Sequence, residues 1–235
     1  MNGKHITAIV LAAGKGSRMH SETPKQFLDL CGKPVLYHSL KRFEESSVDE
    51  IILVTSKEDI TYCKENIVEK YQLHKIKQVV EGGTQRYWSV RNGLHAIVST
   101  DYVLIHDAAR PCLMVKSIEQ SIIEVMESGA CTLGVPVKDT IKVVDEFCMG
   151  IETPPREYLW QVQTPQSFCY EDIMKAYHRM EQEKNTDITD DTMIMERYLN
   201  KKTKLILGDY RNIKVTTPED LLMAEIFLEK SEKNC

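Results

Sequence analysis

Five continuous apolar runs recur along the chain, and their rhythm most constrains the fold. They are ITAIVLAA (6–13), EIILVTS (50–56), IKQVVE (76–81), DYVLIHD (101–107) and CTLGVPV (131–137). Runs rich in Val, Ile and Leu that do not alternate with polar residues are typical of parallel strands buried on both faces. Helix-like stretches separate them. The sequence therefore predicts right-handed βαβ units and a doubly wound, mostly parallel α/β sheet.

The helical stretches are recognised by apolar residues three and four positions apart. One follows Pro34, which suits a first helical turn. The sets are Leu36, Leu40 and Phe43; then Val90, Leu94 and Ile97; then Ile118, Ile122, Val125 and Met126. Later in the chain, helices are predicted over 171–182 and 190–199, and a strand over 203–209. A final helix is predicted over 216–230, with Thr217 as its cap and Pro218 at its first position.

The rhythm changes at about residue 138. The stretch 138–165 has alternating apolar residues, a glycine turn and a Pro-Pro break. This pattern predicts a hairpin or β-arm, at about 138–160, that projects from the sheet instead of another βαβ unit. Because the chain shows no repeat, low-complexity tract or linker, we expect a single domain over 1–235 with this arm.

Composition excludes several classes of function. The net charge is −5 and there is no basic tract, which argues against nucleic-acid binding. The apolar run near the N-terminus is too short to span a bilayer and lacks the flanks of a signal peptide, so we expect a cytoplasmic protein with no membrane partner. The seven cysteines form no Cys-x-x-Cys pair and the histidines no His-Glu-x-x-His motif, which argues against a disulfide framework or a zinc site.

A glycine loop follows the first predicted strand at its carboxyl edge, where parallel sheets bind ligands. In LAAGKGSRM (11–19), Gly14 and Gly16 would let backbone N–H groups surround an anion. The loop is not a Walker A motif, because no Gly-Lys-Ser/Thr closes it, and it is not a dinucleotide fingerprint, because Met19 stands where the third glycine would be. A plain tight turn is the alternative reading.

Cations near this loop favour a phosphate ligand. Lys15 and Arg18 lie within it, and Lys25 and Lys33 follow. Arg18 can bind phosphate oxygens with two nitrogens, and Lys25 can place a compact charge on the same group. Surface solvation would explain any one cation, but it explains less well two that bracket a glycine loop.

A second cluster, HDAARP (106–111), ends the fourth predicted strand. A carboxylate there, Asp107, is well placed to hold Mg²⁺ on a polyphosphate, and Arg110 lies close by. The alternative is that Asp107 caps the following turn. In a third segment (81–94), Arg86 and Ser89 could bind a base or ribose, with ordinary helix initiation as the alternative.

Five further polar residues sit late in the chain, and each taken singly favours a structural role. They are Thr140 and Arg156 in the arm, Thr164, Thr189 and Lys214. Neighbouring apolar residues suit a strand that turns Lys214 to the opposite face, which could be solvent. No Ser-His-Asp elbow or general-base pair stands out, so a reaction that needs only positioned charge fits best.

Seven motifs in order carry a resemblance to a known family. They are LAAGKGSRM…PKQF, GGTQRYWSVRNGL, HDAARP, KDTIK, LWQVQTPQSF, DITDD and NIKVTTPEDL, between about residues 6 and 228. Together they resemble the 2-C-methyl-D-erythritol 4-phosphate cytidylyltransferases. The resemblance implies a Rossmann-like nucleotidyltransferase, a homodimer, and Mg²⁺ or another divalent metal. It implies transfer of a cytidylyl group from CTP to a polyol phosphate, with release of pyrophosphate, in the methylerythritol phosphate route to isoprenoids.

The resemblance also implies roles for individual residues. The catalytic pair would be Arg18 and Lys25. The nucleotide site would comprise Ala12, Ala13, Gly14, Lys15, Gly16, Gly82, Arg86 and Ser89. Contacts to the acceptor would come from Asp107, Arg110, Thr140, Arg156, Thr164, Thr189 and Lys214, of which Thr140 and Arg156 would reach over from a partner's arm. Asp107 would also hold the metal. The chain departs from the family pattern at Thr84, Gln85 and Cys112, which affects local details only.

Three alternatives stay open at this point. A ribitol-5-phosphate cytidylyltransferase would share the chemistry, but Ala109 in DAAR, where that family usually has Val, favours methylerythritol phosphate. A sugar-nucleotide glycosyltransferase would commonly carry an Asp-x-Asp pair, which is absent. A nucleotide sensor would have no use for Arg156 and Lys214.

Overall fold

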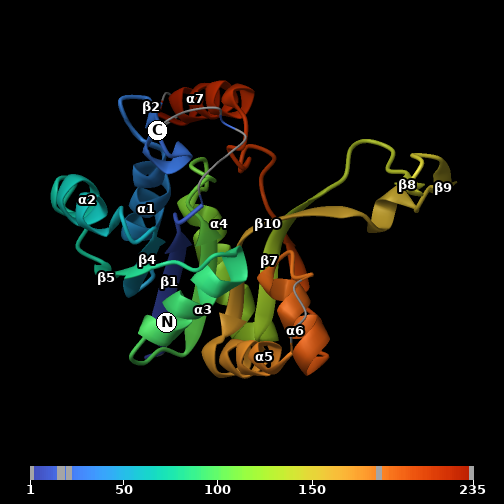
Figure 1. Cartoon of the computed structure of the whole chain (residues 1–235), viewed down its shortest axis with the longest axis horizontal. Coiled ribbons are helices and arrows are strands. Elements are labelled where there is room, and N and C mark those ends of the chain that lie inside the picture. Colours follow the sequence, from blue (N-terminus) through green and yellow to red (C-terminus); the bar gives the residue numbers. More distant parts are fainter. Residues whose placement is uncertain (1–2, 15–18, 20–22, 184–186, 233–235) are drawn as a thin grey trace.

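A seven-stranded sheet forms the centre of the computed structural model, which describes residues 3–14, 19, 23–183 and 187–232 (Figure 1). Its strand order is β11-β7-β10-β6-β1-β4-β5. The strands are β1 (Ile6–Leu11), β4 (Glu50–Thr55), β5 (Ile76–Glu81), β6 (Tyr102–Asp107), β7 (Ala130–Pro136), β10 (Trp160–Cys169) and β11 (Lys204–Leu207). The pairings show that β10 alone runs opposite to the others. The predicted mostly parallel sheet is confirmed.

Helices cover both faces of this sheet, as the doubly wound prediction requires. On one face lie α1 (Val35–Glu45), α2 (Ile60–Cys63) with the π-helical turn Lys64–Glu69, and α4 (Val115–Ser128). On the other lie α3 (Arg86–Ala96), α5 (Tyr170–Gln182) and α6 (Asp191–Leu199). Along β1, Ala8 and Val10 pack toward the first face and Ile9 toward the second, because successive side chains of a strand alternate.

The last helix, α7 (Pro218–Glu232), packs outside these two layers (Figure 1). Its residues Ala224 and Leu228 join a small third core with Leu30 and Val35. Two short strands, β2 (Asp29–Leu30) and β3 (Lys33–Pro34), form a separate hairpin under it. Among the described residues, no helix combines the length and apolarity needed to cross a bilayer.

The strand β10 is the one strand of the seven-stranded sheet that the sequence did not predict. It lies between β6 and β7, antiparallel to both, and the register shifts between Val162 and Gln166. Pro165 falls inside this irregularity, where the missing N–H breaks no ladder hydrogen bond, and its peptide bond to Thr164 is cis. Because its buried residues include Gln163 and Gln166, the segment shows no apolar run.

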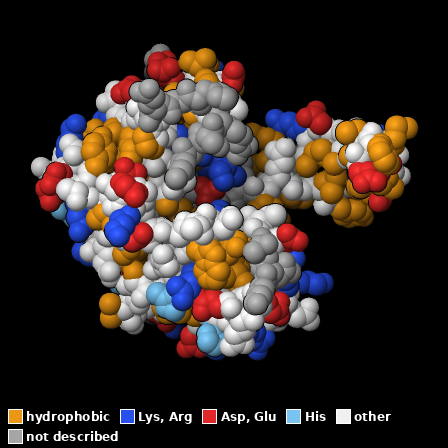
Figure 2. Space-filling view, viewed as in Figure 1, with side chains coloured by type: hydrophobic (Ala, Val, Ile, Leu, Met, Phe, Trp, Pro, Cys, Tyr) orange, Lys and Arg blue, Asp and Glu red, His pale blue; other side chains and the backbone are white. Residues whose placement is uncertain are grey.

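The predicted arm projects from the sheet between β7 and β10 (Figure 1). It carries the short antiparallel pair β8 (Val143–Val144) and β9 (Gly150–Glu152) and a 3₁₀ turn, Arg156–Tyr158. Hydrophobic side chains gather on it (Figure 2), and Phe147 is 77% exposed. The arm starts and ends side by side, because Pro136 pairs with Trp160.

Candidate active site

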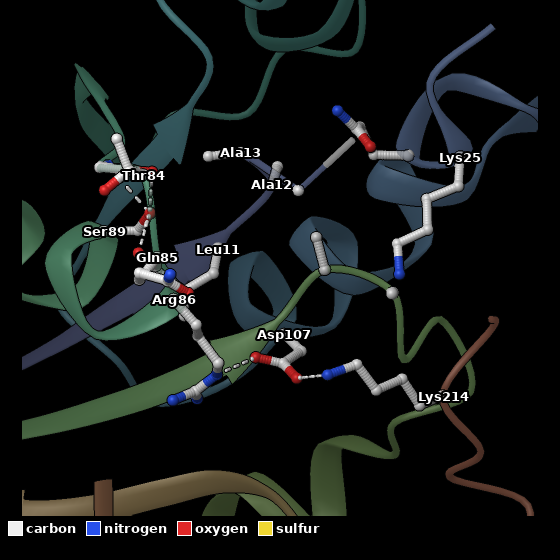
Figure 3. Close-up of a pocket in the computed structure, with 15 residues that line it drawn as sticks. Leu11, Ala12, Ala13, Lys25, Thr84, Gln85, Arg86, Ser89, Asp107 and Lys214 are labelled. Carbon is white, nitrogen blue, oxygen red and sulfur yellow. Dashed lines mark hydrogen bonds and ion pairs between the residues drawn. The ribbon is translucent and has the colours of Figure 1, made fainter. Parts of the chain in front are cut away.

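A cavity of about 430 Å³ opens where β1 and β6 end and α3 begins (Figure 3). The carboxyl ends of parallel strands are the usual ligand edge of such a sheet. The lining residues are Leu11, Ala12, Ala13, Gly14, Lys25, Gln26, Gly83, Thr84, Gln85, Arg86, Ser89, Asp107, Ala108, Ala109 and Lys214. Residues 11–14, residues 107–109 of the HDAARP segment and the start of α3, which are far apart in the sequence, therefore meet in one pocket.

Small residues let two loops pass close together on one side of the pocket. A Cβ added to Gly82 would lie 2.4 Å from the Cβ of Ala13 and 2.9 Å from the Oγ of Ser89. The Ser89 hydroxyl accepts a hydrogen bond from the N–H of Gly83 at 3.0 Å. The helix thus fixes the glycine segment, and only glycine leaves room for it beside the loop after β1.

Gly82→Ala is expected to destabilise the fold by about 1–3 kcal/mol, because the added methyl group must push the two loops apart. The same displacement would deform the segment that the resemblance implies for nucleotide binding, so the KM for that nucleotide should rise about tenfold for each 1.4 kcal/mol of binding lost. Thermal unfolding and initial rates check both effects. Gly150→Ala is the matched control, since its Cβ would meet nothing within 4 Å. Equal stability and equal KM in the two variants would contradict the close packing proposed for Gly82.

The carboxylate of Asp107 lies between two cations (Figure 3). Its Oδ1 accepts from Nε of Arg86 at 2.9 Å, and its Oδ2 from Nζ of Lys214 at 2.6 Å. Burial opposes the charged carboxylate, but Arg86 and Lys214 outweigh burial and hold the pKa of Asp107 well below its ordinary value. The side chain is therefore ionised, and Lys214 is drawn into the pocket instead of facing bulk solvent.

Backbone contacts bring Lys214 to this place. The N–H of Val215 donates to the carbonyl of Ala109 at 2.7 Å, so the late segment lies along the HDAARP loop. The same segment positions Lys25, whose Nζ donates to the carbonyl of Val215 at 3.3 Å. Lys25 belongs to the 3₁₀ turn Lys25–Phe27 and lines the cavity. Lys15, Gly16 and Arg18 lie outside the described residues.

Arg86 is held by a second carboxylate that the sequence did not single out. Its Nη1 lies 2.9 Å from Oδ2 of Asp191, which is fully buried at the start of α6. The Tyr177 hydroxyl donates to the other oxygen of Asp191 at 2.7 Å. Burial disfavours the charge on Arg86, but Asp107 and Asp191 outweigh it and raise the pKa of that guanidinium. The DITDD motif was noted, but nothing local in it indicated Arg86 as a partner.

Thr164 and Arg110 lie beside the pocket and do not line it. The Thr164 hydroxyl accepts from the backbone N–H of Asp107 at 3.2 Å and lies 2.9 Å from Nδ1 of His106. Burial lowers the pKa of His106 to about 3, so this imidazole is neutral. Arg110 donates to the carbonyl of Asn212 at 2.7 Å. It faces a neighbouring hollow of about 340 Å³, which Lys214 also lines.

Three predicted residues lie apart from the pocket in this chain. Thr189 is exposed just before α6, and its hydroxyl contacts the sulfur of Met193. Thr140 and Arg156 are exposed on the arm, where Arg156 donates to the carbonyl of Lys138 at 2.9 Å. Their predicted contacts to an acceptor stay predictions.

The sequence model of the 2-C-methyl-D-erythritol 4-phosphate cytidylyltransferase family matches residues 6–230. An enzyme of that name from Lachnospira eligens is 52% identical over 225 residues, which cover 95% of this chain and 99% of that protein. One from Caldanaerobacter subterraneus is 46% identical over 228 residues, covering 96% and 100%. The crystal structure of the 4-diphosphocytidyl-2C-methyl-D-erythritol synthase from Anaerococcus prevotii superposes with a TM-score of 0.85 at 33% identity, covering 97% and 100%.

These matches extend over nearly the whole chain and agree with the resemblance carried by the ordered motifs. They do not favour the ribitol phosphate alternative. The chain belongs to the 2-C-methyl-D-erythritol 4-phosphate cytidylyltransferase family, nucleotidyltransferases that use CTP for cytidylyl transfer in the isoprenoid methylerythritol phosphate pathway.

Proposed function

We propose that the pocket around Asp107 is where this chain transfers the cytidylyl group of CTP to 2-C-methyl-D-erythritol 4-phosphate. The products would be 4-diphosphocytidyl-2-C-methyl-D-erythritol and pyrophosphate. The observation that supports this assignment is the convergence of Lys25, Arg86 and Lys214 on one cavity in a chain of net charge −5. A cationic pocket in an acidic protein favours anionic ligands at that place.

The nucleotide would occupy the side of the pocket built by small residues. Ala12, Ala13 and Gly14 follow β1, and Gly82 and Ser89 lie across from them. Short side chains there leave room for a base and ribose and expose backbone groups for hydrogen bonding. The triphosphate would then extend toward Lys25, and Lys15, Gly16 and Arg18 stay predicted contacts to it.

The reaction needs positioned charge more than acid–base chemistry. A phosphate oxygen of the acceptor attacks the α-phosphorus of CTP, and the bond from that phosphorus to the β-phosphate oxygen breaks. The acceptor oxygen is already anionic, so the main barrier is the approach of one anion to another. Lys25 and Arg18 would stabilise the charge on the α-phosphoryl group, and fixed alignment of the reactants adds to the rate.

The acceptor's phosphate would lie near Lys214 and Arg110. In this structure Lys214 is paired with Asp107, and it also lines the neighbouring hollow that Arg110 faces. An incoming phosphate would give Lys214 a second anionic partner close to the cavity. Thr164 would act by fixing the backbone of Asp107. Thr189 would contact the acceptor from the segment just before α6.

Enzymes of this family generally use a divalent metal. Asp107 is the sole carboxylate among the described residues that line the cavity, and those residues contain no cluster of three metal-binding side chains. This donor set fits Mg²⁺, which is commonly held by one or two carboxylates together with substrate phosphates and water. We propose Asp107 as the protein ligand. When bound there, the ion would neutralise charge on the triphosphate.

We propose that the arm pairs two copies of the chain into a homodimer. Its exposed apolar residues, among them Phe147, Met149 and Ile151, are a surface that a second copy would cover. Thr140 and Arg156 of one copy would then reach the partner's pocket and contact the acceptor. The predicted single domain over 1–235 and the cytoplasmic location stay predictions.

Paired assays of pyrophosphate release test the proposed reaction. Purified protein is given CTP and Mg²⁺ with either 2-C-methyl-D-erythritol 4-phosphate or ribitol 5-phosphate. We expect turnover with the first acceptor and a kcat/KM at least 10²-fold lower with the second, because a site built for one polyol leaves polar groups unpaired with another. Equal or greater turnover with ribitol 5-phosphate would overturn the acceptor assignment.

A further inference from the structure

We propose that the buried pair Tyr177–Asp191 positions Arg86 for the reaction, so that two residues outside the pocket set the geometry of the cations inside it. This inference rests on the proposed function of the pocket. It assigns Tyr177 and Asp191 as positioning residues, because neither lines the cavity.

The contacts form one continuous series from Lys214 to Tyr177. Lys214 donates to Asp107, Asp107 accepts from Arg86, Arg86 pairs with Asp191, and Asp191 accepts from Tyr177. The four distances are 2.6, 2.9, 2.9 and 2.7 Å. Five elements or loops contribute, so this series of contacts links the helices α5 and α6 to the pocket.

Arg86 contacts two carboxylates through two different nitrogens. Its Nε donates a hydrogen bond to Asp107, and its Nη1 lies 2.9 Å from Oδ2 of Asp191 in an ion pair that lacks hydrogen-bond geometry. Attraction at two different nitrogens restricts the direction of the planar guanidinium. If the contact to Asp191 were lost, the group could rotate about the remaining contact to Asp107. The orientation of Asp107, and with it the place of Lys214, depends on that second contact.

Asp191 is itself rigidly placed. It is fully buried, and its backbone N–H donates to Oε1 of Gln166 in β10 at 2.8 Å. The amide of Gln166 in turn donates to Asp190, the capping residue of α6. Tyr177 is 2% exposed, and its hydroxyl reaches Asp191 from α5. The strand β10 therefore fixes the backbone of Asp191, and the helix α5 fixes its carboxylate.

Stability alone does not explain this arrangement. Burying a carboxylate beside a guanidinium carries a desolvation cost that the ion pair often fails to recover, and apolar replacements of buried ion pairs are frequently neutral or stabilising. In this protein the buried carboxylate of Asp191 pairs with Arg86, which lines the proposed substrate cavity. Control of Arg86 is a function that an apolar pair could not perform.

Two substitutions test the proposal with little change of volume. Tyr177→Phe removes one hydroxyl and should lower kcat/KM about tenfold. Asp191→Asn removes the charge and should lower it about 10²-fold, which is the size expected when a reacting group is misplaced by about 1 Å. Tyr198→Phe is the matched control, because Tyr198 is another buried tyrosine of the same core cluster and is 7% exposed.

A double-mutant cycle separates positioning from simple stabilisation. In an Arg86→Met background, Tyr177→Phe should cause no further loss of kcat/KM, because its effect passes through Arg86. A structural effect would instead add to the loss caused by Arg86→Met. Thermal unfolding of each variant shows that the proteins compared are folded.

The pH profile provides a second readout. Asp191 is faced by Arg86 from α3, Tyr177 from α5 and its neighbour Asp190, with the neutral Gln166 from β10. Burial raises the pKa of Asp191, although Arg86 and the Tyr177 hydroxyl act in the opposite direction. Removing that hydroxyl raises the pKa further, and only ionised Asp191 pairs with Arg86. The acid limb of kcat/KM should therefore move to higher pH in Tyr177→Phe than in Tyr198→Phe.

The outcomes are distinguishable from failure of the proposed function. If the wild-type protein shows no turnover of CTP with the acceptor, the function itself is wrong. If the wild type is active and Tyr177→Phe matches Tyr198→Phe in rate and pH profile, the positioning role is wrong. Additive losses in the Arg86→Met background would also overturn it, whereas a vanishing effect there supports it.

Discussion

Lys25→Ala is expected to lower kcat by about 10²–10³, the usual loss when one preorganised charge that stabilises a transition state is removed. The Nζ of Lys25 is held at the pocket by the carbonyl of Val215 instead of extending freely into solvent. Its charge is therefore in place before the nucleotide arrives, and alanine leaves that position neutral. Rates at saturating CTP and acceptor measure the loss directly.

Lys33→Ala is the control for this prediction. Lys33 is a nearby cation that contacts the hydroxyl and ring of Tyr37 and does not line the cavity. We expect its kcat to stay near the wild-type value. Arg18 lies outside the described residues. We expect Arg18→Ala to lower kcat as much as Lys25→Ala does. Near-normal turnover of Lys25→Ala would refute its catalytic assignment.

At a polyol phosphate concentration near the wild-type KM, where Arg156→Ala is far from saturation, a mixed dimer that carries Lys25→Ala in one copy and Arg156→Ala in the other is expected to recover about half of the wild-type activity. In a dimer whose arms are exchanged, one pocket combines the intact Lys25 of one copy with the intact Arg156 of its partner. The second pocket lacks both. Each variant alone has no intact pocket, so recovery requires that the arm serve the partner's site.

Co-expression of the two variants with different affinity tags, followed by purification on both, yields the mixed dimer. Alone, Arg156→Ala should raise the KM for the polyol phosphate and leave CTP binding nearly unchanged. The mixed dimer should instead show the wild-type KM for the polyol phosphate in its active half. No recovery above the two parent variants would mean that each arm serves its own chain or that no dimer forms.

The parts of the fold that local patterns encode were predictable. All five apolar runs are strands, and in β1, β4, β6 and β7 the continuous hydrophobicity matches continuous burial. The edge strand β5 is only half-buried. The amphipathic helices followed from their spacing. Residues 12–14 and 107–109 line one pocket, as expected where parallel strands end at a common edge. Gly82 and Ser89 likewise lie together at its wall.

Two features depended on contacts distant in sequence. The strand β10 is buried although it carries glutamines, because Gln166 bonds to the start of α6 and Gln163 donates to the carbonyl of Asp209. Polar side chains satisfied in this way leave no hydrophobic signal. The pairing of Arg86 with Asp191 spans more than a hundred residues, and no local spacing encodes it.

The antiparallel pairing of Pro136 with Trp160 closes the base of the arm within the sheet. The excursion between these residues is therefore a closed loop, and melting it leaves every hydrogen bond of the seven-stranded sheet in place. The length and composition of the arm's tip can change without shifting the register between β7 and β10. In the proposed dimer, the tip can therefore vary while Thr140 and Arg156, each four residues from the Pro136–Trp160 pair, keep their places at the base of the arm.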